Sequence, residues 1–325
     1  MAGRHLKALI AAYRDKDDLA FRRAAQAIIE EEEGKKHVAL ARDLRRLLAA
    51  GSAVHMPVDN APLPEPPRDR DTDLPLTEIR SSRLLLDDLV LDTGLNGRLH
   101  ELIREVPAWP ELDAAGVPRR RSLLLFGPPG CGKSSIAAAL AGDLGWPLAT
   151  VRTETLMSSY LGETASNLNR VFEFAHSGPY VVLFDEFDSL GKVRDDPTDH
   201  GELRRVVNAV LQLIDRYQGP SLLVAATNHQ HVLDPALWRR FSEVLEVPLP
   251  TADQRRVLLM RTLRGHIGPG IDLEPIVSGL DGLPHAAAEL VSHDALRLAI
   301  LDGRTAVTQT DLQEALSRTT RRPWR

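Results

Sequence analysis

Hydrophobic residues recur at helical spacing in three stretches before residue 50, so three amphipathic helices are predicted there. Their apolar positions are Leu6, Leu9, Ile10 and Tyr13, then Phe21, Ala25, Ile28 and Ile29, then Val38, Ala41, Leu44, Leu47 and Leu48. The acidic run Glu30–Glu33 and Gly34 separate the second helix from the third. Because about fifty residues bury only a small core, we expect residues 1–50 to form a helical N-terminal module that is marginally stable alone.

The hydrophobic periodicity stops between Gly51 and Pro75. Five prolines in this stretch favour an extended, semi-rigid backbone; they are Pro57, Pro62, Pro64, Pro66 and Pro67. We therefore expect residues 51–75 to be a Pro-rich linker.

From about Leu84 onward, short hydrophobic runs alternate with helical stretches such as Leu203–Tyr217. The predicted strands are Ser122–Phe126, Leu148–Val151, Tyr180–Phe184, Leu222–Thr227 and Val244–Val247. Strands that alternate with helices are typical of a parallel sheet covered by helices on both faces. Residues 76–250 are expected to form this large α/β domain.

After Pro250 the pattern is helical only. Thr251 is suited to cap a helix over Val257–Leu263, and the patterns Ala286–Leu301 and Thr310–Leu316 follow. We expect residues 251–325 to form a small helical domain that closes the chain.

Composition narrows the possible classes of function. The 325 residues are 43% hydrophobic and 26% charged, as in an ordinary globular protein, and no apolar run approaches 18 residues. With no secretory signal pattern either, a cytoplasmic protein without membrane contact is expected. The net charge of −5 disfavours bulk binding to nucleic acid. The single cysteine, Cys131, excludes an intramolecular disulfide and a multi-cysteine metal site.

The strongest chemical signal is Gly127-Pro-Pro-Gly-Cys-Gly-Lys-Ser134, a complete G-x-x-x-x-G-K-[ST] motif between a predicted strand and a predicted helix. Its glycines allow backbone N–H groups to turn inward around phosphates, beside a helix N-terminus. Lys133 would hold the β- and γ-phosphates of ATP, and Ser134 would ligate Mg²⁺. The expected cofactor-binding residues are Gly127, Pro128, Pro129, Gly130, Cys131, Gly132, Lys133, Ser134 and Ser135.

Two acids follow the predicted strand Tyr180–Phe184. Asp185 is placed to bind Mg²⁺ through water, and Glu186 to orient and activate the attacking water. A pair of acids after a strand is weak alone, because a solvated strand end has the same composition. Together with the phosphate loop it predicts a P-loop NTPase.

With these motifs in place, the sequence resembles the AAA family over about Leu84 to Ser317. Leu86–Asp92 is similar to the segment before the family's first helix, which lines the adenine pocket. Ala225–Asn228 resembles the sensor-1 strand, and Leu233–Phe241 resembles the second region of homology. The resemblance implies ATP hydrolysis with Mg²⁺ by a homo-oligomeric ring, a hexamer in many relatives.

The resemblance also implies roles for further residues. Asn228 would hydrogen-bond the γ-phosphate or the attacking water, and Arg239 and Arg240 would reach a nucleotide held by the neighbouring subunit. The two arginines are adjacent here, whereas many relatives space them apart, so the principal arginine finger is left open between them.

Ser159–Glu163 resembles the family's first pore loop, which implies that Tyr160 and Leu161 contact a protein substrate. Gly191–Gly201 is either a second pore loop or a surface loop. In the last domain, His285 replaces part of the family's S-G-A element. It is either a sensor-2 residue or, as we favour, an ordinary residue at the start of a helix. His229 and His231 have no third ligand nearby and are not expected to bind a metal.

The expected function is ATP-driven remodelling, unfolding or disassembly of protein substrates. The N-terminal module is expected to recruit a substrate or adaptor, and a partner protease is one expected associate, as in some bacterial relatives. Two alternatives stay open: a loader-type switch acting with nucleic acid, and a nucleotide-dependent assembly scaffold.

Overall fold

The computed structural model describes residues 63–156, 161–188, 209–228 and 238–324, without the side chains of Leu161 and Gly162. The chain divides into two units, Met1–Asp59 and Asn60–Arg325, and everything described belongs to the second. The three predicted N-terminal helices therefore lie outside the described residues. Within the described residues, none of the helices combines the length and the apolar composition that a membrane crossing requires.

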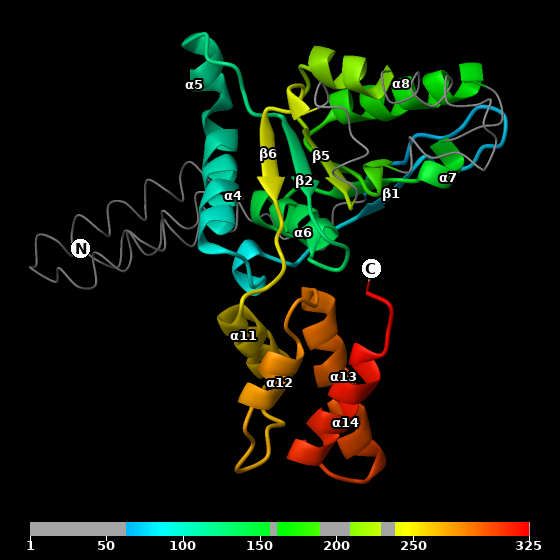
Figure 1. Cartoon of the computed structure of the whole chain (residues 1–325). Helices are drawn as coiled ribbons and strands as arrows, with labels where there is room; N and C mark the ends of the chain where they lie inside the picture. Colours follow the sequence, from blue (N-terminus) through cyan, green and yellow to red (C-terminus); the bar gives the residue numbers. More distant parts are fainter. Residues whose placement is uncertain (1–62, 157–160, 189–208, 229–237, 325) are drawn as a thin grey trace, which may run out of the picture. The chain divides into compact units, whose positions relative to one another are not determined.

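A six-stranded sheet organises the α/β part of the described chain (Figure 1), with the strand order β1–β3–β4–β5–β2–β6. The strands are β1 (Thr77–Arg80), β2 (Ser122–Phe126), β3 (Leu148–Val151), β4 (Val181–Phe184), β5 (Leu222–Thr227) and β6 (Glu243–Glu246). All neighbouring strands run parallel except β1, which pairs antiparallel with β3 at the edge. The mostly parallel sheet is confirmed, whereas β1 is not among the strands predicted from the sequence.

Helices cover both faces of this sheet, and the central strands β4 and β5 are buried at every position. On β5, Leu223 and Ala225 face one core, and Leu222, Val224 and Ala226 face the other. The first core contains side chains of α8 (Leu161–Ser177) and of the helical residues 209–216. The second contains side chains of α4 (Thr93–Glu105) and α6 (Lys133–Leu144).

Short helical elements lie between these longer ones along the chain. They are the 3₁₀ helices η1 (Leu86–Asp88) and η2 (Val106–Ala108) and the helices α5 (Trp109–Ala114) and α7 (Thr153–Leu156). Asp92 caps α4 by accepting hydrogen bonds from the backbone N–H groups of Gly94 and Leu95. The family-like segment Leu86–Asp92 thus leads directly into the first long helix.

The predicted helical domain after Pro250 is confirmed. It consists of α11 (Ala252–Thr262), α12 (Glu274–Gly279), α13 (His285–Leu301) and α14 (Gln309–Thr320), which enclose their own apolar core. Thr251 and Thr308 each cap a helix through a reciprocal capping box, as expected for Thr251. We call this part the lid.

Residues 63–75, the described part of the expected linker, are attached to the α/β domain. The Asp69 carboxylate accepts hydrogen bonds from the backbone N–H of Thr72 and from the Asn167 amide on α8, at 2.8 and 2.6 Å. These bonds, led by that of Thr72, lower the pKa of Asp69 to about 2. Arg170 also donates to the Arg68 carbonyl at 2.5 Å.

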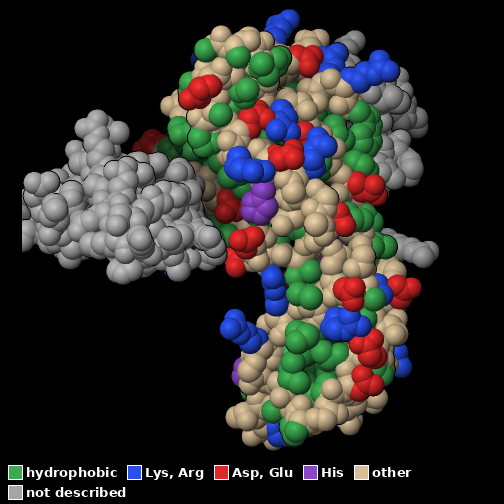
Figure 2. All heavy atoms as spheres, turned by 90° about the vertical axis from the view of Figure 1, so that its left-hand side faces the viewer, with side chains coloured by type: hydrophobic (Ala, Val, Ile, Leu, Met, Phe, Trp, Pro, Cys, Tyr) green, Lys and Arg blue, Asp and Glu red, His purple; other side chains and the backbone are tan. Residues whose placement is uncertain are grey.

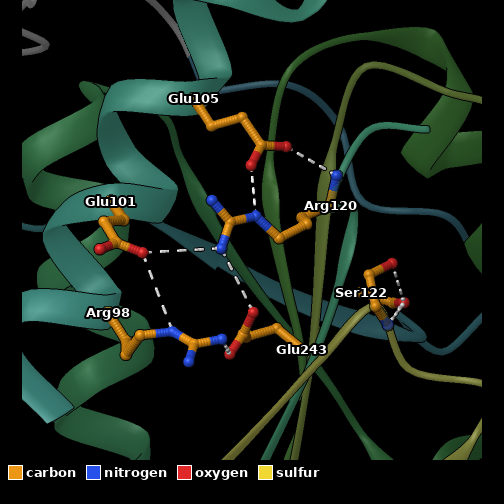
Figure 3. Close-up of polar contacts among 7 residues, drawn as sticks. Arg98, Glu101, Glu105, Arg120, Ser122 and Glu243 are labelled. Atoms are coloured by element: carbon orange, nitrogen blue, oxygen red, sulfur yellow. Dashed lines mark hydrogen bonds and ion pairs between the residues drawn. The ribbon is translucent and has the colours of Figure 1, made fainter. Parts of the chain in front are cut away.

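A charged network joins α4 to the β6 edge of the sheet (Figure 3). The Glu243 side chain is only 6% exposed and accepts hydrogen bonds from Arg98 at 2.5 Å and from Arg120 at 3.3 Å. Arg120 also pairs with Glu105 on α4. A buried carboxylate needs such partners, because losing them leaves its charge uncompensated.

We therefore expect Glu243→Ala to lower the free energy of unfolding by about 2 kcal/mol, since it leaves two guanidinium groups without their shared carboxylate. Glu246→Ala is the matched control, because Glu246 lies on the same strand and is exposed. Its expected effect is below about 0.5 kcal/mol. Urea denaturation followed by circular dichroism measures both changes, and equal losses would contradict a stabilising role for the network.

Candidate active site

The loop between β2 and α6 carries the Gly127–Ser134 motif, and its start requires glycine. Gly127 has φ +143°, and a Cβ atom there would lie 2.2 Å from the Val247 carbonyl oxygen. That backbone is fixed in turn, because the Val247 N–H donates to the Phe126 carbonyl at 2.7 Å. A side chain at this position would push the loop off the end of the sheet.

Lys133, the first residue of α6, holds the loop from inside. Its side chain is 6% exposed, and its ammonium donates to the carbonyl oxygens of Gly127 and Pro128 at 2.9 and 2.8 Å. Burial lowers the pKa of Lys133, while Cys131, Asp185 and Asp188 oppose that shift. The lysine is thus a concentrated positive charge at the centre of the loop.

The end of β4 brings the two predicted acids to the same place. The Ser134 hydroxyl donates to Asp185 at 2.6 Å, so two hard oxygen ligands of the kind that Mg²⁺ prefers lie side by side. Glu186 adopts φ +47°, which residues with a Cβ rarely adopt, and its N–H donates to Asp185 at 2.9 Å. Backbone strain of this kind collects at active sites.

One buried acid of this region was missed by sequence reasoning. Asp188 is 5% exposed, accepts a hydrogen bond from the Thr227 hydroxyl at 2.9 Å, and contributes to the field around Lys133. It ties the end of β4 to the end of β5, where Asn228 follows. The repeat of an acid three positions after Asp185 is the signal that could have identified it.

A cavity of ≈ 330 Å³ lies over the loop and is lined by eight of the predicted site residues. Its lining comes from the phosphate loop, from the ends of β4 and β5, and from the lid. The lining residues are Gly130, Gly132, Lys133, Ser134, Ser135, Asp185, Glu186, Asn228, His285, Ala286 and Glu289. Backbone N–H groups, an ammonium, a hydroxyl and carboxylates around one cavity can hold a phosphate chain and its metal.

The lid reaches the phosphate loop through the first turn of α13. The Ala286 N–H donates to the Gly130 carbonyl at 3.0 Å, and the backbone N–H of His285 interacts with the Cys131 sulfur. Gly130 has φ +73°, and a Cβ atom there would come within 3.2 Å of the Ala286 methyl group. Burial raises the pKa of the Cys131 thiol, and Lys133 and the His285 N–H oppose this.

His285 occupies the first position of α13, as expected for a helix-start residue, and it is also one of the residues that line the cavity. Both ring nitrogens are shielded from solvent, and neither makes a well-formed hydrogen bond within the described chain. Burial lowers the pKa of His285, and the backbone at Val90 opposes the shift.

The two arginines named as finger candidates are in different environments. Arg240 forms an ion pair with Asp215. Arg239 is exposed, and within the described residues it forms no ion pair. Neither lines the cavity of its own chain.

The remaining candidates lie wholly or partly outside the described residues. Tyr160, His229, His231 and all of Gly191–Gly201 lie outside the described residues, and Leu161 is described only as the first residue of α8. Among described residues, no three acids, histidines or cysteines are grouped to bind a metal.

Comparison with known proteins agrees with this geometry. Residues 123–249 match the model of the "ATPase family associated with various cellular activities (AAA)". The solved AAA domain of FIGL-1 is similar in structure, with a TM-score of 0.61 and 25% identity over 74% of this chain and 85% of that one.

Relatives differ in how much of their length the chain covers. The AAA family ATPase y4kL of Sinorhizobium fredii is 39% identical over 98% of this chain and 96% of its own length. The proteasome-activating nucleotidase of Pyrococcus horikoshii is 35% identical over 69% of this chain, which spans 59% of that protein. The ATP-dependent zinc metalloprotease FtsH 3 of Sphaerobacter thermophilus is 34% identical over 61% of this chain and 42% of its own length. The chain belongs to the AAA family and is an ATPase.

Proposed function

We propose that this ATPase remodels, unfolds or disassembles protein substrates as a homo-oligomeric ring in the cytoplasm. The observation that carries the ATP chemistry is the cavity that unites Lys133, Ser134, Asp185, Glu186 and Asn228. Relatives named proteasome-activating nucleotidase and ATP-dependent protease support a protein substrate.

In this proposal the phosphate loop binds ATP through its backbone N–H groups, and Lys133 moves its ammonium from two loop carbonyls to the β- and γ-phosphates. Ser134 and Asp185 would hold Mg²⁺, which supplies positive charge to the developing phosphate oxygens. Glu186 orients the attacking water and accepts its proton. Asn228 donates to the γ-phosphate or to that water.

Arg239 is the better candidate for the finger that reaches a neighbouring subunit. Its guanidinium is exposed, whereas that of Arg240 is engaged by Asp215 on the same chain. A guanidinium keeps its charge and engages phosphate oxygens through several donors. A ring, with six subunits as in many relatives, would bring Arg239 to the next cavity.

Substrate contact is proposed for Tyr160 and Leu161, whose aromatic and apolar side chains suit sequence-tolerant contact with an unfolded chain. The N-terminal residues 1–50 would recruit a substrate, an adaptor or a partner protease. Arg68 and Asp69 are hydrogen-bonded to α8, so in this proposal the linker ends before Arg68.

The alternatives are a loader-type switch on nucleic acid and an assembly scaffold. Acidic and basic side chains are interspersed over the α/β face in Figure 2, so this face offers no continuous basic stripe to nucleic acid. A scaffold would not need the aromatic-apolar-Gly sequence at Tyr160.

Lys133→Ala should raise the Kd for ATP about 10- to 100-fold, because it removes a charge-assisted contact to the phosphates. Isothermal titration calorimetry measures the change. Arg104→Ala, an exposed site on α4, is the control and should bind as the parent does. Unchanged ATP binding by folded Lys133→Ala would rule out the proposed nucleotide site.

Arg239→Ala should lower kcat by about 10³-fold or more while ATP still binds, since an arginine finger acts on the transition state. Arg240→Ala should have a much smaller effect on kcat, because it breaks a surface ion pair of at most about 1 kcal/mol. Mixed rings of Arg239→Ala and Glu186→Gln subunits should regain part of the activity. The reverse ranking of the two arginines would assign the finger to Arg240.

Unfolded polypeptide should stimulate ATP hydrolysis, and single- or double-stranded DNA should not. Tyr160→Ala should keep basal hydrolysis and weaken the response to unfolded polypeptide about tenfold, as for the loss of an aromatic anchor. Steady-state ATPase assays measure both. Stimulation by DNA alone would favour the loader-type alternative, and loss of basal hydrolysis would show that Tyr160 is structural.

A further inference from the structure

Two parts of the chain enclose the nucleotide cavity, so its width depends on how these parts are held together. The phosphate loop and the strand ends belong to the α/β domain, whereas Ala286 and Glu289 belong to the lid. The chain passes from one part to the other between β6 and α11 (Figure 1). Side-chain contacts between the two parts therefore influence how readily the cavity opens.

The pivot between the two parts is short. On the sheet side, the backbone N–H of Val247 is hydrogen-bonded to β2 at 2.7 Å. On the lid side, the buried Arg255 of α11 donates to the Pro250 carbonyl at 3.0 Å. Pro248 and Leu249 lie between these two anchored residues, so a movement of the lid relative to the sheet turns about them.

Residues 86–92 of the α/β domain lie against the lid. Both ends of this segment are fixed within the α/β domain. Leu86 is 1% exposed and its N–H donates to Asp143 of α6 at 2.8 Å, and Asp92 caps α4. In the middle of the segment, Val90 packs against the apolar core of the lid. The segment is therefore a firmly attached part of the α/β domain on which the lid rests.

Arg261, in the last turn of α11, contacts the same segment through its guanidinium. Its Nη1 atom lies 3.2, 3.1 and 3.4 Å from the carbonyl oxygens of Asp87, Asp88 and Leu89. These carbonyls are at the end of the 3₁₀ helix η1. The last carbonyls of a helix have no partner within it and carry partial negative charge, so a guanidinium is a suitable donor for them.

The position of Arg261 makes this contact sensitive to movement of the lid. Arg261 is nine residues beyond Ala252, the first residue of α11, which places it about 14 Å from the pivot end of the helix. A rotation of the lid by about 10° across the helix axis would move the guanidinium by about 2 Å. Hydrogen bonds of 3.1 to 3.4 Å do not survive such a displacement. Opening of the lid therefore requires the loss of these hydrogen bonds.

We propose that Arg261 is a latch that holds the lid closed over the cavity and thereby limits the rates at which a nucleotide enters and leaves. The inference rests on the proposed nucleotide site and adds a positioning residue outside it. Arg261 is not among the residues that line the cavity, so its contact stabilises the closed lid equally with and without a nucleotide. Such a contact slows entry and release by the same factor and leaves the affinity unchanged.

Stopped-flow fluorescence with a labelled ADP analogue, mant-ADP, measures both rate constants on the full chain. Arg261→Met keeps the apolar stem and removes the donors. The association and dissociation rate constants should therefore each rise about fivefold, while the Kd changes by less than about twofold. Arg264→Met, at an exposed arginine just beyond the same helix, is the matched control and should bind and release mant-ADP as the parent does.

Two results would overturn the proposal. Unchanged rate constants in folded Arg261→Met would show that the contact does not restrain the lid. A rise in the dissociation rate constant alone, with a matching rise in the Kd, would show that Arg261 supports the bound state and not the closed lid. Thermal melting shows whether each variant is folded, and Arg261→Gln, which also removes the guanidinium, is measured in the same way if Arg261→Met does not fold.

Lys133→Ala separates failure of the latch from failure of the nucleotide site. If Lys133→Ala binds mant-ADP as the parent does, the nucleotide site itself is wrong. If Lys133→Ala binds more weakly and Arg261→Met leaves both rate constants unchanged, the site stands and the latch is wrong.

Discussion

The buried ammonium of Lys133 is the interaction on which the rest of the site depends. A positive charge is costly to remove from water, and here two loop carbonyls accept its hydrogen bonds while Asp185 and Asp188 supply opposite charge. The same contacts fold the loop around the ammonium, since both carbonyls belong to the first two loop residues. The Lys133 ammonium therefore both shapes the loop and provides its positive charge for phosphate. A substitution at Lys133 changes both properties.

The sheet supplies the partners of this charge because its central strands are parallel. The carboxyl ends of parallel strands meet at one edge, where ligands bind in open α/β sheets. Asp185 follows β4 and Asn228 follows β5, while the phosphate loop follows β2 between β5 and β6. Burial on both faces fixes the register of these strands, and so the hydrophobic layers position the polar residues of the cavity.

Strands and motifs could be predicted from the sequence where neighbouring residues along the chain determine them. The runs at β2, β3 and β5 gave the observed bounds, because continuous apolar residues are needed in strands buried on both faces. Strand β1 was missed because Thr77–Arg80 is a short edge strand whose partner β3 lies some seventy residues on. The capping of α13 by Gly130 was also missed, since it joins backbone atoms far apart in sequence, and Pro284 gives no side-chain signal of a cap. The spacing of Asp188 from Asp185 could have drawn attention to it, but its burial and its hydrogen bond from Thr227 are visible only in the structure.

The contact between the Cys131 sulfur and the start of α13 makes the reactivity of this thiol depend on the position of the lid. Cys131 is the chain's single cysteine, it is 1% exposed, and lid residues lie over it. A thiol reagent attacks as the thiolate forms, which requires both access and solvation of the sulfur. Movement of α13 away from the loop would supply both. The rate at which a small electrophile labels the Cys131 thiol therefore depends on how often the lid opens. It can be measured in the unmodified protein, without a dye attached to any other site.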